Sequence, residues 1–228
     1  MAKNQPQVTP TPQEEVITKS EAFVTKYGKV LAIAVVAVLV IILGVFAYNT
    51  YYAGPRQDKA STELTKAQDL FGQEQYDKAN TAFQKVISDF GGTDAANLAQ
   101  LYSGLCLANT GKWAEAVKAL EAFSTKSDAM ISPAATEALG NAYAHVKDFD
   151  KAVSTLKKAA EMADKQSING ANVSLSPNFL LQAGILLESQ NKNDEALQLY
   201  KDIKAKYVNS QLVGSQEIDK YIERLEQK

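Results

Sequence analysis

The sequence predicts an all-α protein, with a single N-terminal transmembrane helix followed by an α-solenoid of about four helical hairpins and a C-terminal capping helix. Two observations predict this class. Residues 30–47 lack any polar side chain. Four later segments repeat one spacing of small and large apolar residues. A third observation concerns function: the chain of 228 residues has one Cys and one His among 24 basic and 26 acidic side chains, which leaves little material for a catalytic site.

The composition excludes several classes of protein before any element is placed. One Cys cannot close an internal disulfide or build a Cys-based zinc site, and one His excludes multi-histidine metal sites. A formal net charge of -2 gives no reason to expect nucleic acid as a partner. The sequence also shows no phosphate loop, nucleophile elbow or paired-carboxylate motif. We therefore predict that the chain is not an enzyme and has no catalytic residue, no metal and no cofactor.

Residues 1–29 are predicted to be a flexible cytoplasmic leader. They hold Pro6, Pro10 and Pro12 in a Gln/Thr-rich setting, with too little apolar surface to offset the entropy of ordering the chain. Within this leader, Glu14–Tyr27 has enough amphipathic character for a short helix.

A transmembrane helix is predicted over residues 30–49. Its apolar part reads VLAIAVVAVLVIILGVFA, and at about 1.5 Å per residue this run spans about 27 Å, close to the hydrocarbon thickness of a bilayer. Basic and aromatic residues suited to the two membrane interfaces flank the run, and we identify six of them as interface anchors: Lys26, Tyr27, Lys29, Tyr48, Tyr51 and Tyr52.

Two alternatives compete with a membrane anchor. A buried core helix is disfavoured, because eighteen consecutive apolar residues leave no face for water. A cleaved signal peptide would fit the small-residue site at Val45–Ala47. The 29-residue leader and the length of the apolar run favour an uncleaved anchor over that signal peptide.

The chain after the span is predicted to lie across the membrane from the leader. The positive-inside bias is slight, since Lys19, Lys26 and Lys29 precede the span while Arg56 and Lys59 follow it closely. A short leader before a single span normally stays in the cytoplasm. Residues 50–57 are predicted as a juxtamembrane linker, because the proline of Gly54-Pro55 lacks a donor N–H and should end the helix.

Four segments after the linker share one pattern, at residues 67–86, 104–123, 140–159 and 184–203. Each contains an alanine at the same place, and these alanines are 37, 36 and 44 residues apart: Ala79, Ala116, Ala152 and Ala196. Each segment opens with a small residue twelve positions before the alanine, and a large residue follows four positions after it. This spacing indicates helix–turn–helix units, in which the small residue lets two helices approach and the large one fills the space beside them.

These segments resemble the tetratricopeptide repeat (TPR), over about residues 58–210. The stretches Leu139–Tyr143 (LGNAY) and Gly111–Ala116 (GKWAEA) are close to the repeat consensus, whereas Ala67 and Asn193 depart from it. The resemblance implies a TPR-like domain over 58–228. Its repeats are placed at about 60–92, 97–130, 133–166 and 177–210, with a capping helix at 215–228.

Local signals support this phase. Ser132-Pro133 and Ser176-Pro177 each suggest a capping residue followed by a proline at the first helical position. Residues 166–175 (QSINGANVSL) have no helical period and are predicted as an inserted loop, either a tolerated surface insertion or a binding loop.

A curved stack of such hairpins presents its first helices on a concave surface. The resemblance to the TPR family implies ten candidate partner-binding residues, if the groove positions of that family are transferred to this alignment of the four repeats. They are Leu64, Gln68, Phe71, Leu98, Leu101, Leu105, Glu137, Asn141, Leu181 and Ile185. The apolar members suit a hydrophobic peptide or helix, unless they pack against neighbouring helices instead. Glu137 would repel a ligand carboxylate, which argues against the carboxylate-clamping mode known in some TPR proteins.

The remaining reactive side chains have structural interpretations. Cys106 falls where the repeat expects alanine and is predicted as a small buried residue. His145 lies near the end of a predicted first helix, and Trp113 occupies an aromatic packing position.

The whole layout of leader, span and repeats resembles the YfgM-like family of bacterial inner-membrane proteins. That resemblance implies a single-pass protein with a cytoplasmic N-terminus and periplasmic repeats. It also implies partnership with the SecYEG translocon and a PpiD-like periplasmic chaperone, as an ancillary factor in protein export. Two other functions fit the same features: a general cell-envelope assembly scaffold, or an organellar import receptor with cytosolic repeats. A membrane enzyme has the least support.

Overall fold

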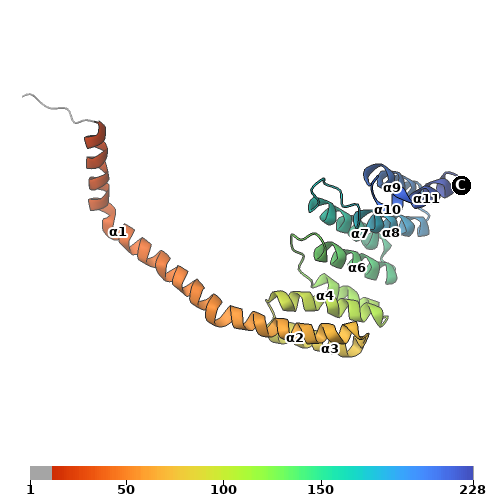
Figure 1. Ribbon diagram of the computed structural model, residues 1–228, viewed down its shortest axis with the longest axis horizontal. Helices are drawn as coiled ribbons and strands as arrows, with labels where there is room; N and C mark the ends of the chain where they lie inside the picture. Colours follow the sequence, from red (N-terminus) through yellow and green to blue (C-terminus); the bar gives the residue numbers. More distant parts are fainter. Residues whose placement is uncertain (1–11, 228) are drawn as a thin grey trace, which may run out of the picture. The chain divides into compact units, whose positions relative to one another are not determined.

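The computed structural model describes the backbone of residues 12–227 and the side chains of residues 25–227. Within this range the regular elements are all helical (Figure 1). They are α1 (Pro12–Tyr48), a π-helical turn η1 (Asn49–Ala53), α2 (Gly54–Gly72), α3 (Tyr76–Phe90), α4 (Asp94–Asn109), α5 (Trp113–Glu121), α6 (Ile131–His145), α7 (Phe149–Lys165), α8 (Ser176–Ser189), α9 (Asn193–Lys206), α10 (Gln211–Gly214) and α11 (Glu217–Glu226). The predicted all-α class is confirmed.

The chain divides into two compact units, Met1–Pro55 and Arg56–Lys228. In the first unit, α1 is long and apolar enough to cross a membrane, and no part of its most apolar stretch is buried. The alternative of a buried core helix is therefore excluded. One exposed N-terminal apolar helix fits either a membrane anchor or a signal sequence.

The described part of the leader is helical. Residues 12–29 are continuous with the apolar run in α1. They include the short helix considered for Glu14–Tyr27, although the leader as a whole was expected to be flexible. The physical reason is cooperativity, since a helix already formed in the apolar run extends backward without a second nucleation step. Residues 1–11 of the predicted leader lie outside the described part of the chain.

The predicted linker at 50–57 is also helical, so Gly54-Pro55 does not end the helix. The π-helical turn carries the chain past the proline: the N–H of Gly54 donates to the carbonyl of Asn49, five residues earlier. Pro55 then occupies the first turn of α2, where a missing N–H costs little. Gly54 suits this turn, because a Cβ added there would lie 3.0 Å from the Asn49 carbonyl oxygen.

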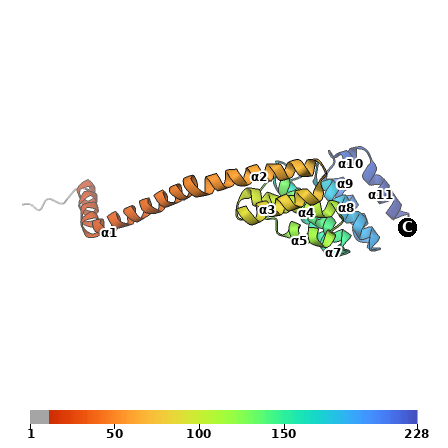
Figure 2. The same ribbon diagram turned by 90° about the horizontal axis from the view of Figure 1, so that it is seen from below.

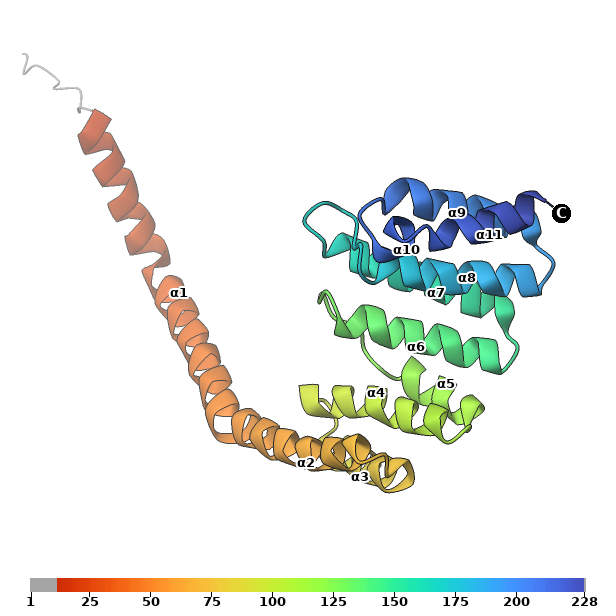
Figure 3. The same ribbon diagram turned by 45° about the vertical axis from the view of Figure 1, so that its right-hand side comes forward.

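In the second unit, α2 to α9 form four antiparallel hairpins that stack in chain order (Figure 3). The hairpins pair α2 with α3, α4 with α5, α6 with α7, and α8 with α9. Their buried faces form neighbouring apolar clusters, in which α3 packs on α4 and α7 on α8. This stack agrees with the predicted solenoid.

The small and large residues of the repeat meet as the spacing predicted. A Cβ added to Gly104, Gly140 or Gly184 would come within 3.0 Å of a side chain of the second helix, belonging to Leu120, Leu156 or Tyr200 respectively. In the first hairpin Ala67 takes the glycine position, and both it and Phe83 are completely buried. Close helix approach therefore depends on the absence of side-chain bulk at one position in each first helix.

The helix starts differ from the predicted serine caps. Ser132 and Ser176 lie inside the first turns of α6 and α8. At α6 the capping group is Asp128, whose carboxylate accepts hydrogen bonds from the backbone N–H groups of Met130, Ile131 and Ser132. Burial alone would raise the pKa of Asp128, but these donors outweigh it and lower the pKa.

The insertion at residues 166–175 is tied to the stack at a buried carboxylate. Asp164 is 7% exposed and accepts hydrogen bonds from the Asn172 N–H, the Ser176 hydroxyl and the Tyr207 hydroxyl. Lys206 completes the group with an ion pair at 2.6 Å. One side chain thus joins the third hairpin, the insertion and the end of the fourth hairpin.

The predicted capping helix is present as α11, which packs next to α9 at the C-terminal end of the stack (Figure 2). Ile218, Ile222 and Leu225 are buried there, while Tyr221 is half-buried. The structure adds the short helix α10 before it, whose start is capped by the Ser210 hydroxyl.

Candidate partner-binding groove

The first helices of the second and third hairpins, α4 and α6, enclose an open groove. Its cavity measures about 350 Å³ and is closed at one end by the start of α5. Small and polar side chains form most of the wall, and the lining residues are Leu105, Ala108, Asn109, Trp113, Glu137, Ala138, Asn141, Ala144 and His145. The volume and mixed polarity suit a few side chains of a bound polypeptide.

An aromatic stack forms one end of the groove. The rings of Trp113 and His145 lie parallel, 3.5 Å apart between centroids and 2° apart in plane. This stack joins α5 of one hairpin to α6 of the next, so it braces the junction between two repeats. His145 is the last residue of α6, as predicted, but its ring is used for packing on Trp113.

A polar pair lies on α6 inside the same groove. Asn141 donates a 2.6 Å hydrogen bond through its amide nitrogen to the carboxylate of Glu137, four residues earlier. Among the described residues no ion pair of Glu137 with a basic side chain is found. The groove therefore presents an acidic group to a ligand, which favours donors such as Lys, Arg or backbone N–H groups.

Three of the ten predicted groove residues meet in this cavity: Leu105, Glu137 and Asn141. Leu98 is half-buried and packs against two apolar clusters, one formed by α2, α3 and α4 and the other by α4, α5 and α6. Leu64 and Leu101 are buried in the core, at 7% and 8% exposure. These last two positions pack against neighbouring helices, which was the competing interpretation.

The outer candidates lie elsewhere along the stack. Phe71 packs edge-on against Tyr76 and Tyr102 at the first hairpin, where Gln68 is half-buried. Leu181 lines a separate cavity of about 410 Å³, bounded by α8, α10 and the end of the insertion. Ile185 of α8 is 44% exposed. The predicted residues thus divide among a groove, a second cavity and the core.

The contribution of α5 to the groove was not predicted from the sequence. Trp113 was assigned to packing, although it both packs and lines the cavity. Its position at the first residue of a second helix, directly after the Gly111 turn, is the signal that could have placed it at the mouth of the hairpin. Ala108 and Ala144 carried no such signal, because alanine is also the commonest core residue of the repeat.

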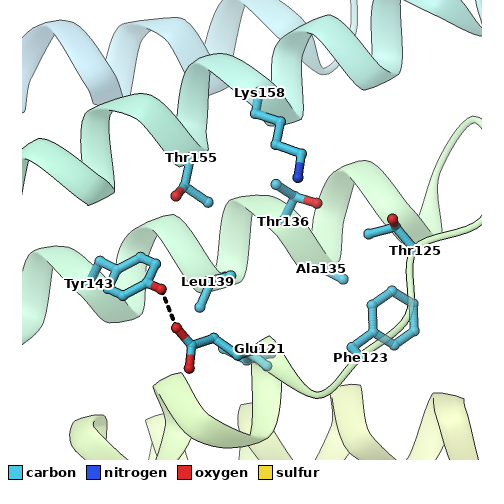
Figure 4. Close-up of a pocket in the computed structure, with 10 residues that line it drawn as sticks. Glu121, Phe123, Thr125, Ala135, Thr136, Leu139, Tyr143, Thr155 and Lys158 are labelled. Atoms are coloured by element: carbon cyan, nitrogen blue, oxygen red, sulfur yellow. Dashed lines mark hydrogen bonds between the residues drawn. The ribbon is translucent and has the colours of Figure 1, made fainter.

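A smaller cavity of about 260 Å³ lies between α5, α6 and α7 (Figure 4). The second helix α5 ends at Glu121, which is earlier than the predicted repeat boundary at 130, and an irregular segment follows it. The Tyr143 hydroxyl donates a hydrogen bond to Glu121 across this cavity. Burial and the neighbouring carboxylate raise the pKa of Tyr143 to about 12, so the phenol remains a donor at neutral pH.

The six predicted interface anchors flank the apolar run of α1. Tyr27, Tyr48, Tyr51 and Tyr52 are all exposed. Tyr48 and Tyr52 face each other with ring centroids 5.3 Å apart, and the Lys26 ammonium lies 5.2 Å from the Tyr27 ring centroid. Lys29 is exposed on the same helix. Side chains of this kind at both ends are typical of helices at a bilayer interface.

Cys106 behaves as the sequence predicted. Its side chain is completely buried in the apolar cluster formed by α2, α3 and α4. Burial raises the pKa of the thiol to about 11. A protonated, buried thiol is a poor nucleophile and a poor metal ligand.

Comparison with known proteins agrees with this architecture. A family model described as a tetratricopeptide repeat-like domain matches residues 21–214, and the chain belongs to that family. No curated protein matches the sequence.

Two solved structures share the fold. MamA (41-end) from Desulfovibrio magneticus RS-1 is 18% identical, with a TM-score of 0.53 over 67% of this chain and 77% of that one. A Podosopora anserina putative kinesin light chain with nearly identical TPR-like repeats is 13% identical, with a TM-score of 0.54 over 75% of this chain and 94% of that one. At such identities the similarity concerns the fold alone.

Proposed function

We propose that this protein is a membrane-anchored TPR scaffold of the bacterial envelope, and that it serves as an ancillary component linking the SecYEG translocon to a PpiD-like periplasmic chaperone. The observation that carries the scaffold role is the open groove between α4 and α6 in an array of TPR-like hairpins. The export partners rest on the resemblance to the YfgM-like family. The span would hold the array near the channel, which raises the effective concentration of both partners.

One observation supports a retained anchor over a cleaved signal peptide. The family match begins at residue 21, before the apolar run, and continues to residue 214 in the repeats. On this proposal the N-terminus is cytoplasmic and the repeats are periplasmic.

The proposal assigns the chain to binding and not to catalysis. The two side chains that chemistry would most readily use are both occupied in packing. Cys106 is buried with a raised thiol pKa, and the His145 ring lies flat on Trp113.

Site-specific photocrosslinking in cells tests the assignment. A photoreactive amino acid replaces Ala144, which lines the groove, and Ala114, which is exposed on α5 outside it, provides the matched control. We expect crosslinks to translocon or chaperone subunits from position 144 and none from position 114. Crosslinks from position 144 to neither partner would contradict the export role.

The same experiment separates the other two functions. Crosslinks to cell-wall or outer-membrane assembly proteins would favour a general envelope scaffold. Digestion of the repeats by protease added from the cytoplasmic side would favour an import receptor.

A charge reversal tests whether the groove itself binds the partner. Glu137→Lys removes the acidic group and repels basic donors, so we expect partner capture to fall about tenfold or more, equivalent to about 1.4 kcal/mol. The control Glu161→Lys reverses an exposed charge on α7 and should leave capture unchanged. Equal loss in both variants would show that net charge, and not the groove, controls binding. Affinity measurements on the purified partner give the readout.

A further inference from the structure

Three linkers between successive hairpins, and the segment that leads from α9 to α10, lie along one edge of the stack (Figure 3). We name this edge the inter-repeat edge, and its four linkers are residues 91–93, 122–130, 166–175 and 207–210. The turns inside the hairpins lie at the opposite edge. Each linker joins the end of a second helix to the start of the next helix, so the first helices all begin at the inter-repeat edge.

Exposed apolar side chains concentrate at this edge. Between Arg56 and Gln227, seven large apolar side chains are exposed, and five of them lie in a linker or directly beside one: Met130, Ile131, Ile168, Val173 and Val208. Ile168, in the insertion, is fully exposed. The other two are Val146, in a hairpin turn, and Ile185, on α8. Exposed apolar groups gathered on one face indicate a contact surface.

Charge has the complementary distribution. The four linkers contain only two charged residues, Lys126 and Asp128, which have opposite sign. The Asp128 carboxylate also accepts a hydrogen bond from the Ile131 N–H at the start of α6. The much shorter hairpin turns carry five charged residues: Glu74, Lys112, Lys147, Asp148 and Lys192. Four more charged residues, Asp94, Glu121, Lys165 and Lys206, lie directly beside the linkers, so the low charge is a property of the linkers themselves and not of the helix ends next to them.

Hydrogen bonds join neighbouring linkers into a continuous edge. Asn97, in the first turn of α4, exchanges two hydrogen bonds with the backbone of Ser124 in the second linker. Gln166 donates to the Ser127 hydroxyl, which joins the second linker to the third. Asp164 then holds the third linker to the fourth through Asn172 and Tyr207. The apolar side chains are thus displayed on a braced surface.

The chain enters the second unit at this edge. Arg56, the first residue of that unit, donates hydrogen bonds to the carbonyls of Asp89 and Gly91 at the first linker. Gln57 accepts from the N–H of Asp94, just beyond that linker. The segment through which the chain leads into the array is therefore attached at the inter-repeat edge.

We propose that the inter-repeat edge rests on the lipid surface of the membrane that the N-terminal helix spans, with Ile168 and its apolar neighbours inserted at the headgroup level. This inference rests on the proposed function, because it requires α1 to be a retained anchor. Lys165, exposed at the end of α7, flanks the third linker, where its stem can follow the apolar surface while the ammonium group reaches lipid phosphates. Tethering removes most of the entropic cost of contact, so few inserted side chains suffice.

Fluorescence quenching by lipid tests this contact in the full chain. The variants Ile168→Cys and Val146→Cys receive the same environment-sensitive dye and are reconstituted into phosphatidylcholine–phosphatidylglycerol vesicles with a nitroxide on the lipid acyl chains. Val146 is an exposed apolar residue at the opposite edge and is the matched control. The unsubstituted chain serves as the labelling blank, since Cys106 is buried. We expect quenching at position 168 to be at least about twofold greater than at position 146.

Flotation of the vesicles separates failure of this inference from failure of the proposed function. If the chain floats with the vesicles but both dyes are quenched equally, the lipid contact is refuted while the anchor stands. If the chain does not float, the anchor and the lipid contact are both refuted. Shielding of position 168 in native membranes but not in pure lipid vesicles would assign the edge to a protein partner and also overturn the proposal. Since Ile168 is fully exposed, its replacement should leave the circular dichroism melting curve unchanged.

Discussion

At the scale of single residues, the stability of the repeat domain depends on glycines at close helix contacts and on one buried carboxylate. Gly104, Gly140 and Gly184 let the helices of three hairpins approach closely. Asp164 is the opposite case, because it is a buried carboxylate that is stable only while its donors surround it. Both kinds of position respond strongly to a change of a few atoms.

Gly184→Ala should destabilise the repeat domain by about 1–3 kcal/mol. The added Cβ would lie 2.2 Å from the ring of Tyr200, which is completely buried and must shift to make room. Gly72→Ala is the matched control, because nothing lies within 4 Å of a Cβ at the end of α2. Urea unfolding followed by circular dichroism measures both variants. Equal stability of the two would refute the close-approach argument.

Asp164→Asn should cost about 2–4 kcal/mol at neutral pH, because it removes the charge that pairs with Lys206 and weakens the hydrogen bonds from the insertion and Tyr207. Urea unfolding gives the difference from the unsubstituted chain. The exposed Asp69→Asn serves as control and should be nearly neutral. A loss no larger than that of the control would show that the buried group is not a stabilising cross-link.

The same carboxylate predicts a pH dependence. Burial alone would raise the pKa of Asp164, but hydrogen bonds from Lys206, Ser176, Asn172 and Tyr207 lower it overall. A lowered folded-state pKa gives stability that is fully present above the unfolded value, about 3.9, and is lost as the pH falls from there through the folded value. Unfolding free energies across this acidic range should therefore fall more steeply for the unsubstituted chain than for Asp164→Asn.

At the scale of elements, the ends of the stack and its junctions determine which surfaces stay covered. The helix α11 covers the last hairpin with Ile218, Ile222 and Leu225, whereas α5 is short and leaves a cavity beside Tyr143. The sequence predicted the first of these features from the periodicity of residues 216–228. It did not predict the second, because the early end of α5 interrupts no apolar pattern.

Ile218→Ala should destabilise the domain by about 2–4 kcal/mol, because it empties a completely buried position between α9 and α11. Val208→Ala deletes apolar atoms from an exposed position nearby and should change the unfolding free energy by less than about 0.5 kcal/mol. Thermal melts of the two variants provide the comparison. A small effect of Ile218→Ala would show that α11 does not cap the stack.

At the scale of the whole molecule, the two compact units have separate sources of stability. The apolar clusters of the second unit use only residues from Ala60 onward, so its core needs no part of the apolar helix. The first unit exposes its apolar run, as a membrane anchor or a signal sequence would.

The fragment 56–228 should consequently be soluble, helical and cooperative in unfolding. Its free energy of unfolding should lie within about 1 kcal/mol of that of the repeat domain in the full chain, since every core residue is retained. Size-exclusion chromatography and urea unfolding check this expectation. An aggregated or unfolded fragment would show that the apolar helix is required for the repeats to fold.

The sequence by itself determined the apolar helix, the number and phase of the hairpins, and the glycine-to-large-residue contacts. These features depend on neighbours within one hairpin, and their spacing is therefore visible along the chain. Tertiary structure alone decided which groove positions stay open: Leu105 lines a cavity while Leu101, one turn earlier, is buried. It also carried the helix through Gly54-Pro55, placed Trp113 on His145, and gathered the exposed linkers with Arg56 on one edge. The physical reason is that exposure at each of these places depends on the packing of residues far apart in the chain, and no local spacing records that packing.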